Sequence, residues 1–121
     1  MARILVVDDD AAVRSTVQRI LERAGHTVQV AENGADGLRK FREARHDLVV
    51  TDLYMPEKEG IETIQDLRAE SPGTRILAVS GGLMGDKTGL VDAELLGADA
   101  TLAKPFTPEQ LQKAVAALLA R

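Results

Sequence analysis

The 121-residue sequence contains no cysteine, so a disulfide framework and a thiol nucleophile are both excluded. Its formal net charge is −4, which leaves no basic surface of the kind that binds nucleic acid directly. No apolar segment approaches the roughly 20 residues of a membrane-spanning helix, and neither a signal-peptide pattern nor a linker is present. These absences predict one domain over residues 1–121, located in the cytoplasm and not bound to a membrane.

What the sequence does contain is a series of short strand-like runs that alternate with apolar residues at helical spacing. Several runs are almost continuously apolar, as expected for strands buried on both faces. The alternation predicts an α/β fold with a doubly wound parallel sheet and right-handed crossovers. The predicted strands are Ile4–Val7, Thr27–Val30, Leu48–Val50, Arg75–Ser80 and Ala100–Ala103, of which Thr27–Val30 alternates polar and apolar residues and suits an edge. Helices are predicted from Ala11 to Ala24, around Leu38 and Phe41, from Ile61 to Leu67, across Leu90–Leu96 and from Pro108.

Four of the five predicted strands end at a polar side chain that could take part in chemistry. The first run is followed by Asp8 and Asp9, the third by Asp52, the fourth ends at Ser80, and the fifth leads into Lys104. Taken singly, the aspartates could cap helices, the serine could start a turn and the lysine could be solvated. Because the carboxyl ends of parallel strands share one rim, the joint pattern predicts a single site.

The three aspartates at this rim point to a hard cation. At a separation of ~4 Å, carboxylates repel by ~4 kcal/mol per pair at an effective dielectric constant of ~20. With oxygen ligands only, the expected ion is Mg²⁺, with Mn²⁺ as the alternative. A further acid, Asp10, is interpreted as the cap of the first helix. His26 and His46 are expected at surface turns, away from the acids.

Taken together, these motifs resemble the receiver domain of two-component response regulators over essentially the whole chain. That resemblance implies a flavodoxin-like (βα)₅ fold of the single-domain, chemotaxis-regulator kind, with strand order 2-1-3-4-5. The residues that carry it are Val6–Asp9, Val50–Pro56, Gly60, Ser80 and Lys104–Phe106.

The resemblance also implies a role for each acidic residue of the site. Asp52 matches the phosphoacceptor. Asp9 and Asp52 match the carboxylate ligands of Mg²⁺, the backbone carbonyl of Tyr54 matches its third protein ligand, and Asp8 matches the acid that acts through a metal-bound water.

The remaining site positions match residues that respond to the phosphoryl group. Ser80 and Lys104 match the hydroxyl and the ammonium group that contact it, and Pro105 matches the proline after a cis peptide bond. Thr101 stands where many relatives carry an aromatic switch residue. The segment between Ser80 and Lys104 is also longer than usual and rich in glycine, so the signal is expected to reorder residues 81–89 and the start of the fourth helix.

As a receiver domain, the chain is expected to be a signalling phosphoacceptor and not an enzyme. Its expected phosphodonor is a sensor histidine kinase or a phosphotransfer protein. Its output would reach an unknown downstream protein, or an output domain elsewhere in a longer protein, through the fourth helix, the fifth strand and the last helix. The expected oligomeric state is a monomer or a weak dimer that depends on phosphorylation.

Two other classes share parts of this pattern. A haloacid-dehalogenase-type phosphatase also combines an aspartyl nucleophile with Mg²⁺, but it requires a second acid where this chain has Tyr54. A flavodoxin would carry a phosphate loop rich in Ser, Thr and Gly after the first strand, where this chain has Asp8–Ala12. Residues Gly82–Thr88 resemble a nucleotide-binding P-loop only faintly, because no glycine directly precedes Lys87.

Overall fold

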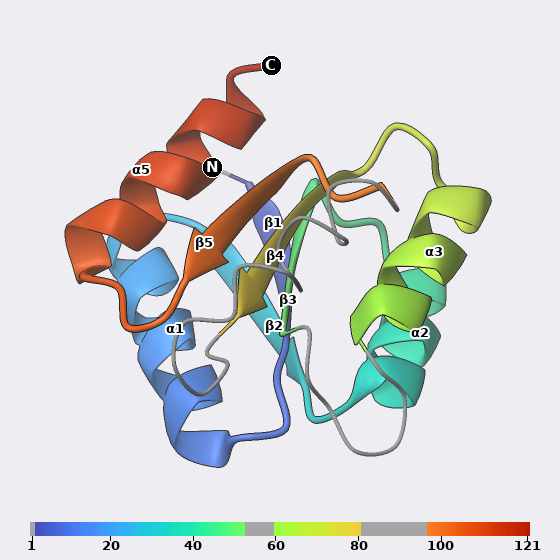
Figure 1. Cartoon of the computed structure of the whole chain (residues 1–121), viewed down its shortest axis with the longest axis horizontal. Coiled ribbons are helices and arrows are strands. Elements are labelled where there is room, and N and C mark those ends of the chain that lie inside the picture. The colour runs from blue at the N-terminus through green and yellow to red at the C-terminus, as the bar shows by residue number, and fades with distance from the viewer. Residues whose placement is uncertain (1, 53–59, 81–96) are drawn as a thin grey trace.

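A single five-stranded sheet forms the centre of the computed structural model, which describes residues 2–52, 60–80 and 97–121 (Figure 1). All neighbouring strands are parallel, and their order is β2-β1-β3-β4-β5. This confirms the predicted doubly wound topology and places β2, the strand in which polar and apolar residues alternate, at an edge. The strands are β1 (Arg3–Val7), β2 (Thr27–Ala31), β3 (Leu48–Asp52), β4 (Arg75–Ser80) and β5 (Ala100–Ala103).

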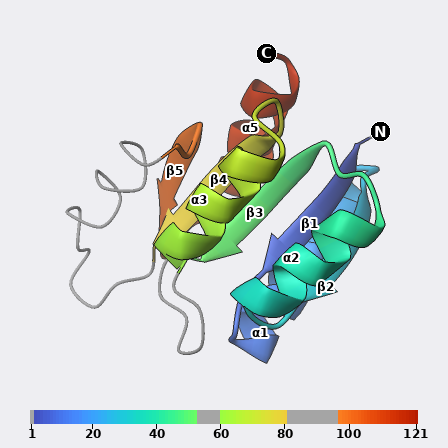
Figure 2. The ribbon, with the colours of Figure 1, turned by 90° about the vertical axis from the view of Figure 1, so that its right-hand side faces the viewer.

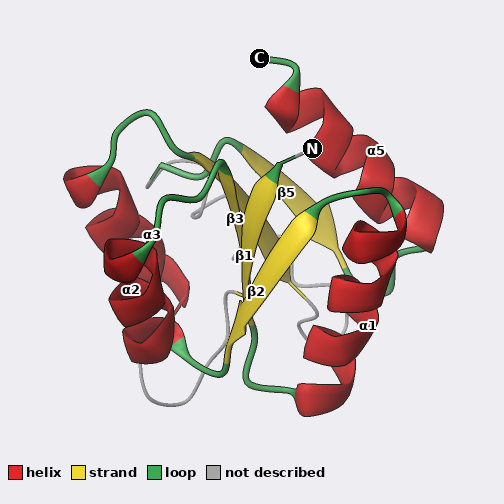
Figure 3. Ribbon diagram, turned by 180° about the vertical axis from the view of Figure 1, so that it is seen from behind, coloured by secondary structure: helices red, strands yellow, loops and turns green. Residues whose placement is uncertain are grey.

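Within the described residues, two helices lie on each face of the sheet (Figures 2 and 3). Helices α1 (Ala11–Arg23) and α5 (Pro108–Leu119) lie on one face, and α2 (Gly34–Glu43) and α3 (Gly60–Glu70) lie on the other. No helix in the described ranges is both long and apolar enough to span a membrane. The helix predicted across Leu90–Leu96 lies outside the described residues.

The alternation of side chains along β1 divides the core into two layers. Leu5 and Val7 belong to the buried cluster beneath α2 and α3. Ile4 and Val6 belong to the cluster beneath α1 and α5. Because both faces of the strand are buried, the run reads as continuously apolar in the sequence.

Local capping fixes where the helices begin. Asp10 is the N-cap of α1, and its carboxylate accepts hydrogen bonds from the backbone amides of Ala12 and Val13. This confirms the interpretation of Asp10 as a helix cap and separates it from the other acids of the rim. At α5, Thr107 and Gln110 form a reciprocal capping box. Pro108, the residue after Thr107, is the first residue of the helix, a position that favours proline.

Helix α2 approaches β1 closely just before the acidic rim. A Cβ atom added to Gly37 would lie 2.8 Å from Cγ2 of Val7, so the helix can lie this near the strand only with glycine there. Val7 is the last residue of β1 and directly precedes Asp8. The packing of α2 therefore supports the strand end that carries the first acid.

The prediction that His46 lies at the surface was wrong. The residue is buried, with 4% of its area exposed, and its ring stacks on Phe41 at a centroid distance of 5.9 Å. Its Nε2 lies 2.8 Å from Oε1 of Gln29. Gln29 pairs with Leu5, whose side chain faces α2, so a partner distant in sequence draws the histidine inward.

Candidate functional site

The carboxyl ends of β1, β3 and β5 bring three aspartates and one lysine together. Asp8 and Asp9 follow β1, Asp52 is the last residue of β3, and Lys104 follows β5. The pairing of β1 with β3 aligns the first two strand ends. One carboxylate oxygen from each aspartate lies within 4.8 Å of the other two, which confirms that the acids predicted at this rim gather at one place.

The ammonium group of Lys104 reaches across β4 to two of these acids. Its Nζ lies 3.2 Å from Oδ2 of Asp8 and 3.4 Å from Oδ2 of Asp52. Asp8 and Asp52 are buried, with 4% and 7% of their residue areas exposed, whereas Asp9 is exposed. A buried carboxylate requires a charge partner or hydrogen bonds, and Lys104 supplies that charge to both buried acids.

The backbone around Asp8 orients its carboxylate. The amide of Asp8 donates to the carbonyl oxygen of Ala31 over 3.1 Å, which prolongs the pairing of β1 with β2 beyond the last strand residue. Its Oδ1 accepts a hydrogen bond of 2.9 Å from the amide of Asp10. Oδ1 is thus turned toward the start of α1, and Oδ2 toward Lys104.

The other predicted site residues are described to different extents. Thr101 lies in β5, paired with Ala78 of β4, and is half-buried. Ser80 closes β4 opposite Ala103, at the same end of the sheet as the acids, but its side chain lies outside the described part of the structure. The Lys104–Pro105 peptide bond is cis, the form that the resemblance implied.

Two of the predictions about the site fall on residues that the structure does not describe. They are the carbonyl of Tyr54 as a ligand and the rearrangement of residues 81–89 with the start of the fourth helix. Both remain predictions from the sequence.

The donor set at the rim suits a metal ion of the hard class. Asp8, Asp9 and Asp52 offer carboxylate oxygens only, and such ligands favour Mg²⁺, Ca²⁺ or Mn²⁺ over Zn²⁺. The exposed position of Asp9 leaves the cluster open on one side. The residues present therefore fit a cation that keeps further coordination positions for other oxygens.

One residue near the acids was given no role by the sequence reasoning. Arg14, the fourth residue of α1, donates from Nη1 to the backbone carbonyl oxygen of Asp8 over 2.8 Å. Its place one turn after the capping acid was the only signal in the sequence. A basic residue there reads equally well as part of the exposed face of the helix.

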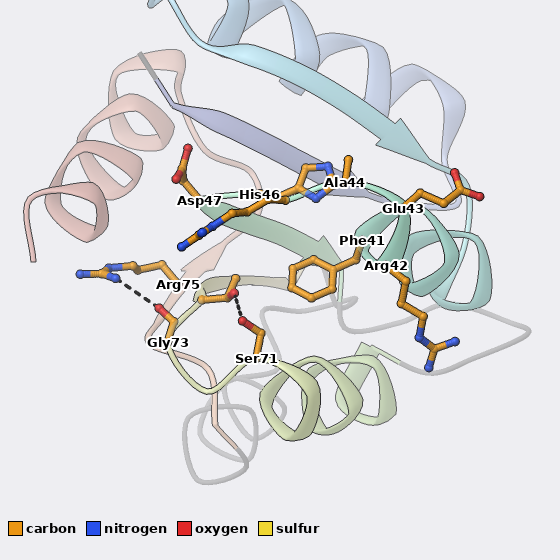
Figure 4. Close-up of a pocket in the computed structure, with 11 residues that line it drawn as sticks. Phe41, Arg42, Glu43, Ala44, His46, Asp47, Ser71, Gly73 and Arg75 are labelled. Carbon is orange, nitrogen blue, oxygen red and sulfur yellow. Dashed lines mark hydrogen bonds between the residues drawn. The ribbon is translucent and has the colours of Figure 1, made fainter.

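A hollow lies at the end of the sheet opposite the acids, where β3 and β4 begin (Figure 4). Its volume is about 550 Å³, and the acids of the rim do not line it. Phe41 and His46 form part of its wall, and Ser71 bonds to Thr74 within it (Figure 4). Charges of both signs surround the hollow, among them Glu43 and Arg75, so it does not extend the acidic site.

Comparisons with known proteins agree with this geometry. A family model described as the response regulator receiver domain matches residues 4–116. The transcriptional regulatory protein ResD of Bacillus subtilis is 37% identical over 119 residues, which cover 98% of this chain and 48% of that protein. The chemotaxis protein CheY of Thermotoga maritima is 33% identical, with 93% of each chain covered.

The solved structures show the same architecture. A receiver domain protein from Clostridium thermocellum has a TM-score of 0.92 at 30% identity, with 100% of this chain and 96% of that one covered. The chain spans about half the length of the transcriptional regulator ResD and of the response regulator MprA from Mycobacterium ulcerans.

Proposed function

Since the chain belongs to the family of response regulator receiver domains of two-component systems, we propose that it accepts a phosphoryl group on Asp52. The observation that carries the proposal is the place of Asp52. It ends the central strand β3, within 4.8 Å of the carboxylates of Asp8 and Asp9 and 3.4 Å from the ammonium group of Lys104. A carboxylate among acids and a lysine is suited to receive an anion once a cation offsets its charge.

The cation in this proposal is Mg²⁺, with Mn²⁺ as a substitute. Asp9 and Asp52 would bind it directly, together with the carbonyl of Tyr54, and Asp8 would act through a bound water. When present, the ion supplies positive charge to the acids and to the incoming phosphoryl oxygens. The support is the oxygen-only donor set of the three aspartates.

The chemical step proposed for Asp52 is an in-line substitution at phosphorus. One carboxylate oxygen bonds to phosphorus while the phosphorus–nitrogen bond of a phosphohistidine breaks and its electron pair leaves with the imidazole. Such a loose transition state requires positioning and charge neutralisation more than covalent assistance. Lys104, already beside Oδ2 of Asp52, would pair with the phosphoryl group, and Ser80 would contact it after transfer.

Receiver domains act together with histidine kinases or phosphotransfer proteins, and one of these is the proposed donor. In this proposal the chain is the substrate of that transfer and not an enzyme, and it works in the cytoplasm. Its output would pass through β5 and α5 and the segment before β5, to a downstream protein or an attached domain. The named relatives include both a transcriptional regulator and a chemotaxis protein.

The test is intact mass after incubation with acetyl phosphate and Mg²⁺. The wild-type chain should gain one phosphoryl group, and Asp52→Asn should gain none because the amide is not a comparable nucleophile. Asp47→Asn is the matched control, because Asp47 precedes the same strand at its other end. Labelling of Asp52→Asn to the wild-type extent would overturn the proposal.

A further inference from the structure

The contact between Arg14 and the backbone of Asp8 joins the first helix to the acidic cluster. Arg14 is half-buried, and its guanidinium group points back along α1 to the carbonyl oxygen at the end of β1, 2.8 Å away. The backbone amide of Arg14 donates to the carbonyl of Asp10 over 2.9 Å, as part of the first turn of the helix. One residue therefore holds both sides of the turn that carries Asp9.

With this contact, Asp8 is held through four of its polar atoms. Its amide donates to Ala31, its Oδ1 accepts from the amide of Asp10, and its Oδ2 faces Lys104. The fourth atom is the carbonyl oxygen, which is bonded to Arg14. Asp9 lies between the two anchored residues Asp8 and Asp10, so the backbone on either side of it is held and the positions open to its carboxylate are restricted.

We propose that Arg14 is a positioning residue, which holds the Asp8–Asp10 turn so that the carboxylates of Asp8 and Asp9 stand ready for a divalent cation. The inference rests on the proposed function, because it concerns the same acidic cluster. Arg14 is not a ligand, since its guanidinium group is a donor only and contacts a backbone carbonyl.

Arg14 has two opposing effects on a cation. Its own positive charge repels Mg²⁺. The hydrogen bond that it donates holds the turn in place, so the turn does not have to reorganise when the ion binds. The guanidinium group is half-buried and partly screened by water, so its repulsion at the cluster is weak. Removal of the Arg14 side chain takes the hydrogen bond from the carbonyl oxygen of Asp8 while the other contacts of Asp8 remain, and we expect this loss of order to outweigh the relief of repulsion. Loss of an outer partner of a metal ligand typically weakens metal affinity by about 10- to 100-fold.

The test compares Mg²⁺ affinity, measured by calorimetry without any phosphodonor, among the wild type, Arg14→Met and Arg14→Lys. Arg14→Met should bind Mg²⁺ about tenfold more weakly. Arg14→Lys, which keeps a flexible donor, should regain part of that loss. Arg19→Met is the matched control, because it removes the same charge from an exposed position of the same helix and should leave the affinity unchanged.

A second measurement separates positioning from a general loss of structure. The labelling rate of Arg14→Met with acetyl phosphate should approach the wild-type rate when Mg²⁺ is raised to saturation, while its thermal midpoint stays near that of Arg19→Met. Should Arg14→Met fail to fold, Arg14→Lys must still bind Mg²⁺ more weakly than the wild type.

Tighter Mg²⁺ binding by Arg14→Met would show that charge repulsion outweighs positioning, and equal binding would show that Arg14 has no net effect; either result would overturn the inference. The proposed function fails in a different way. A wild-type chain that binds Mg²⁺ but takes no phosphoryl group on Asp52 would refute the phosphoacceptor proposal, and the measured affinities would still decide the role of Arg14.

Discussion

Aspartates lie at both ends of the sheet, and they do different work at each end. Where β3 begins, Oδ2 of Asp47 accepts a hydrogen bond of 2.8 Å from the amide of Arg3. Where β5 begins, Oδ2 of Asp99 accepts from the amide of Ile76 over 2.8 Å and from Nη2 of Arg68 over 2.7 Å. At the carboxyl end, Oδ1 of Asp8 also accepts from a backbone amide, that of Asp10, but Oδ2 of Asp8 and Oδ2 of Asp52 share the ammonium group of one lysine.

The difference lies in the partners and not in the residue type. A backbone amide is a fixed donor, so a carboxylate bonded to it stabilises one arrangement of the strands. A carboxylate that shares a mobile ammonium group with other carboxylates can exchange that partner for a cation or a phosphoryl group. The acids where the strands begin therefore serve the fold, and those where the strands end serve the proposed chemistry.

The largest effect predicted by this comparison is on metal binding. Asp9→Ala removes a proposed direct ligand and should weaken Mg²⁺ binding by about 100-fold, the upper end of what is seen even for outer partners of a metal ligand. Calorimetric titration with MgCl₂ measures it. Asp47→Ala, which changes the same residue type at the other end of the sheet, should leave Mg²⁺ affinity unchanged. Equal affinities for Asp9→Ala and the wild type would remove the distinction between the two ends.

The converse prediction concerns stability. Asp99→Ala leaves the amide of Ile76 and the guanidinium group of Arg68 without their shared acceptor. Hydrogen bonds to charged groups contribute about 1.5–3 kcal/mol, so the free energy of unfolding should fall by about 2–3 kcal/mol. Urea denaturation measures the fall. The same variant should take up the phosphoryl group from acetyl phosphate at the wild-type rate, because Asp99 lies away from the rim, and a slowed labelling rate would argue against a purely structural role.

The strand limits and the position of the acidic cluster could be predicted from the sequence, because they depend on local signals and on the topology of a parallel sheet. The strands Arg75–Ser80 and Ala100–Ala103 have the predicted limits because turn signals bound each run. The acidic cluster was predictable because any parallel sheet gathers its strand ends at one rim. The topology, once inferred, brought Asp8 and Asp52 together without knowledge of any side-chain contact.

What the sequence did not reveal are contacts chosen by packing between distant segments. The burial of His46 depends on Gln29 and Phe41, whose side chains meet it only once α2 lies on the sheet. The bond from Arg14 to the carbonyl of Asp8 depends on the angle at which α1 leaves β1. Neither a periodicity nor a local motif encodes such a contact, so both residues read as ordinary polar positions.

The smallest predicted effect is a pH dependence of stability, and it arises from His46 at the end of the sheet where the strands begin. Burial lowers the pKa of His46, the nearby charge of Arg3 lowers it further, and the carbonyl of Ala44 and the carboxylate of Asp47 oppose this shift in part. The folded chain therefore binds fewer protons at His46 than the unfolded chain, whose imidazole has its ordinary pKa of 6.5. The free energy of unfolding should fall as the pH drops through that value and level off below the folded pKa.

Metal-free urea denaturation between about pH 5.5 and 8 measures this slope above the range where carboxyl groups titrate. His46→Gln should lower stability at every pH but remove the larger share of the slope. His26→Gln is the matched control, because burial also lowers the pKa of His26, which is only half-buried and accepts a hydrogen bond from the amide of Ala2. His26→Gln should remove the smaller share of the slope of stability against pH. An undiminished slope in His46→Gln would show that His46 does not carry the acid sensitivity of the fold.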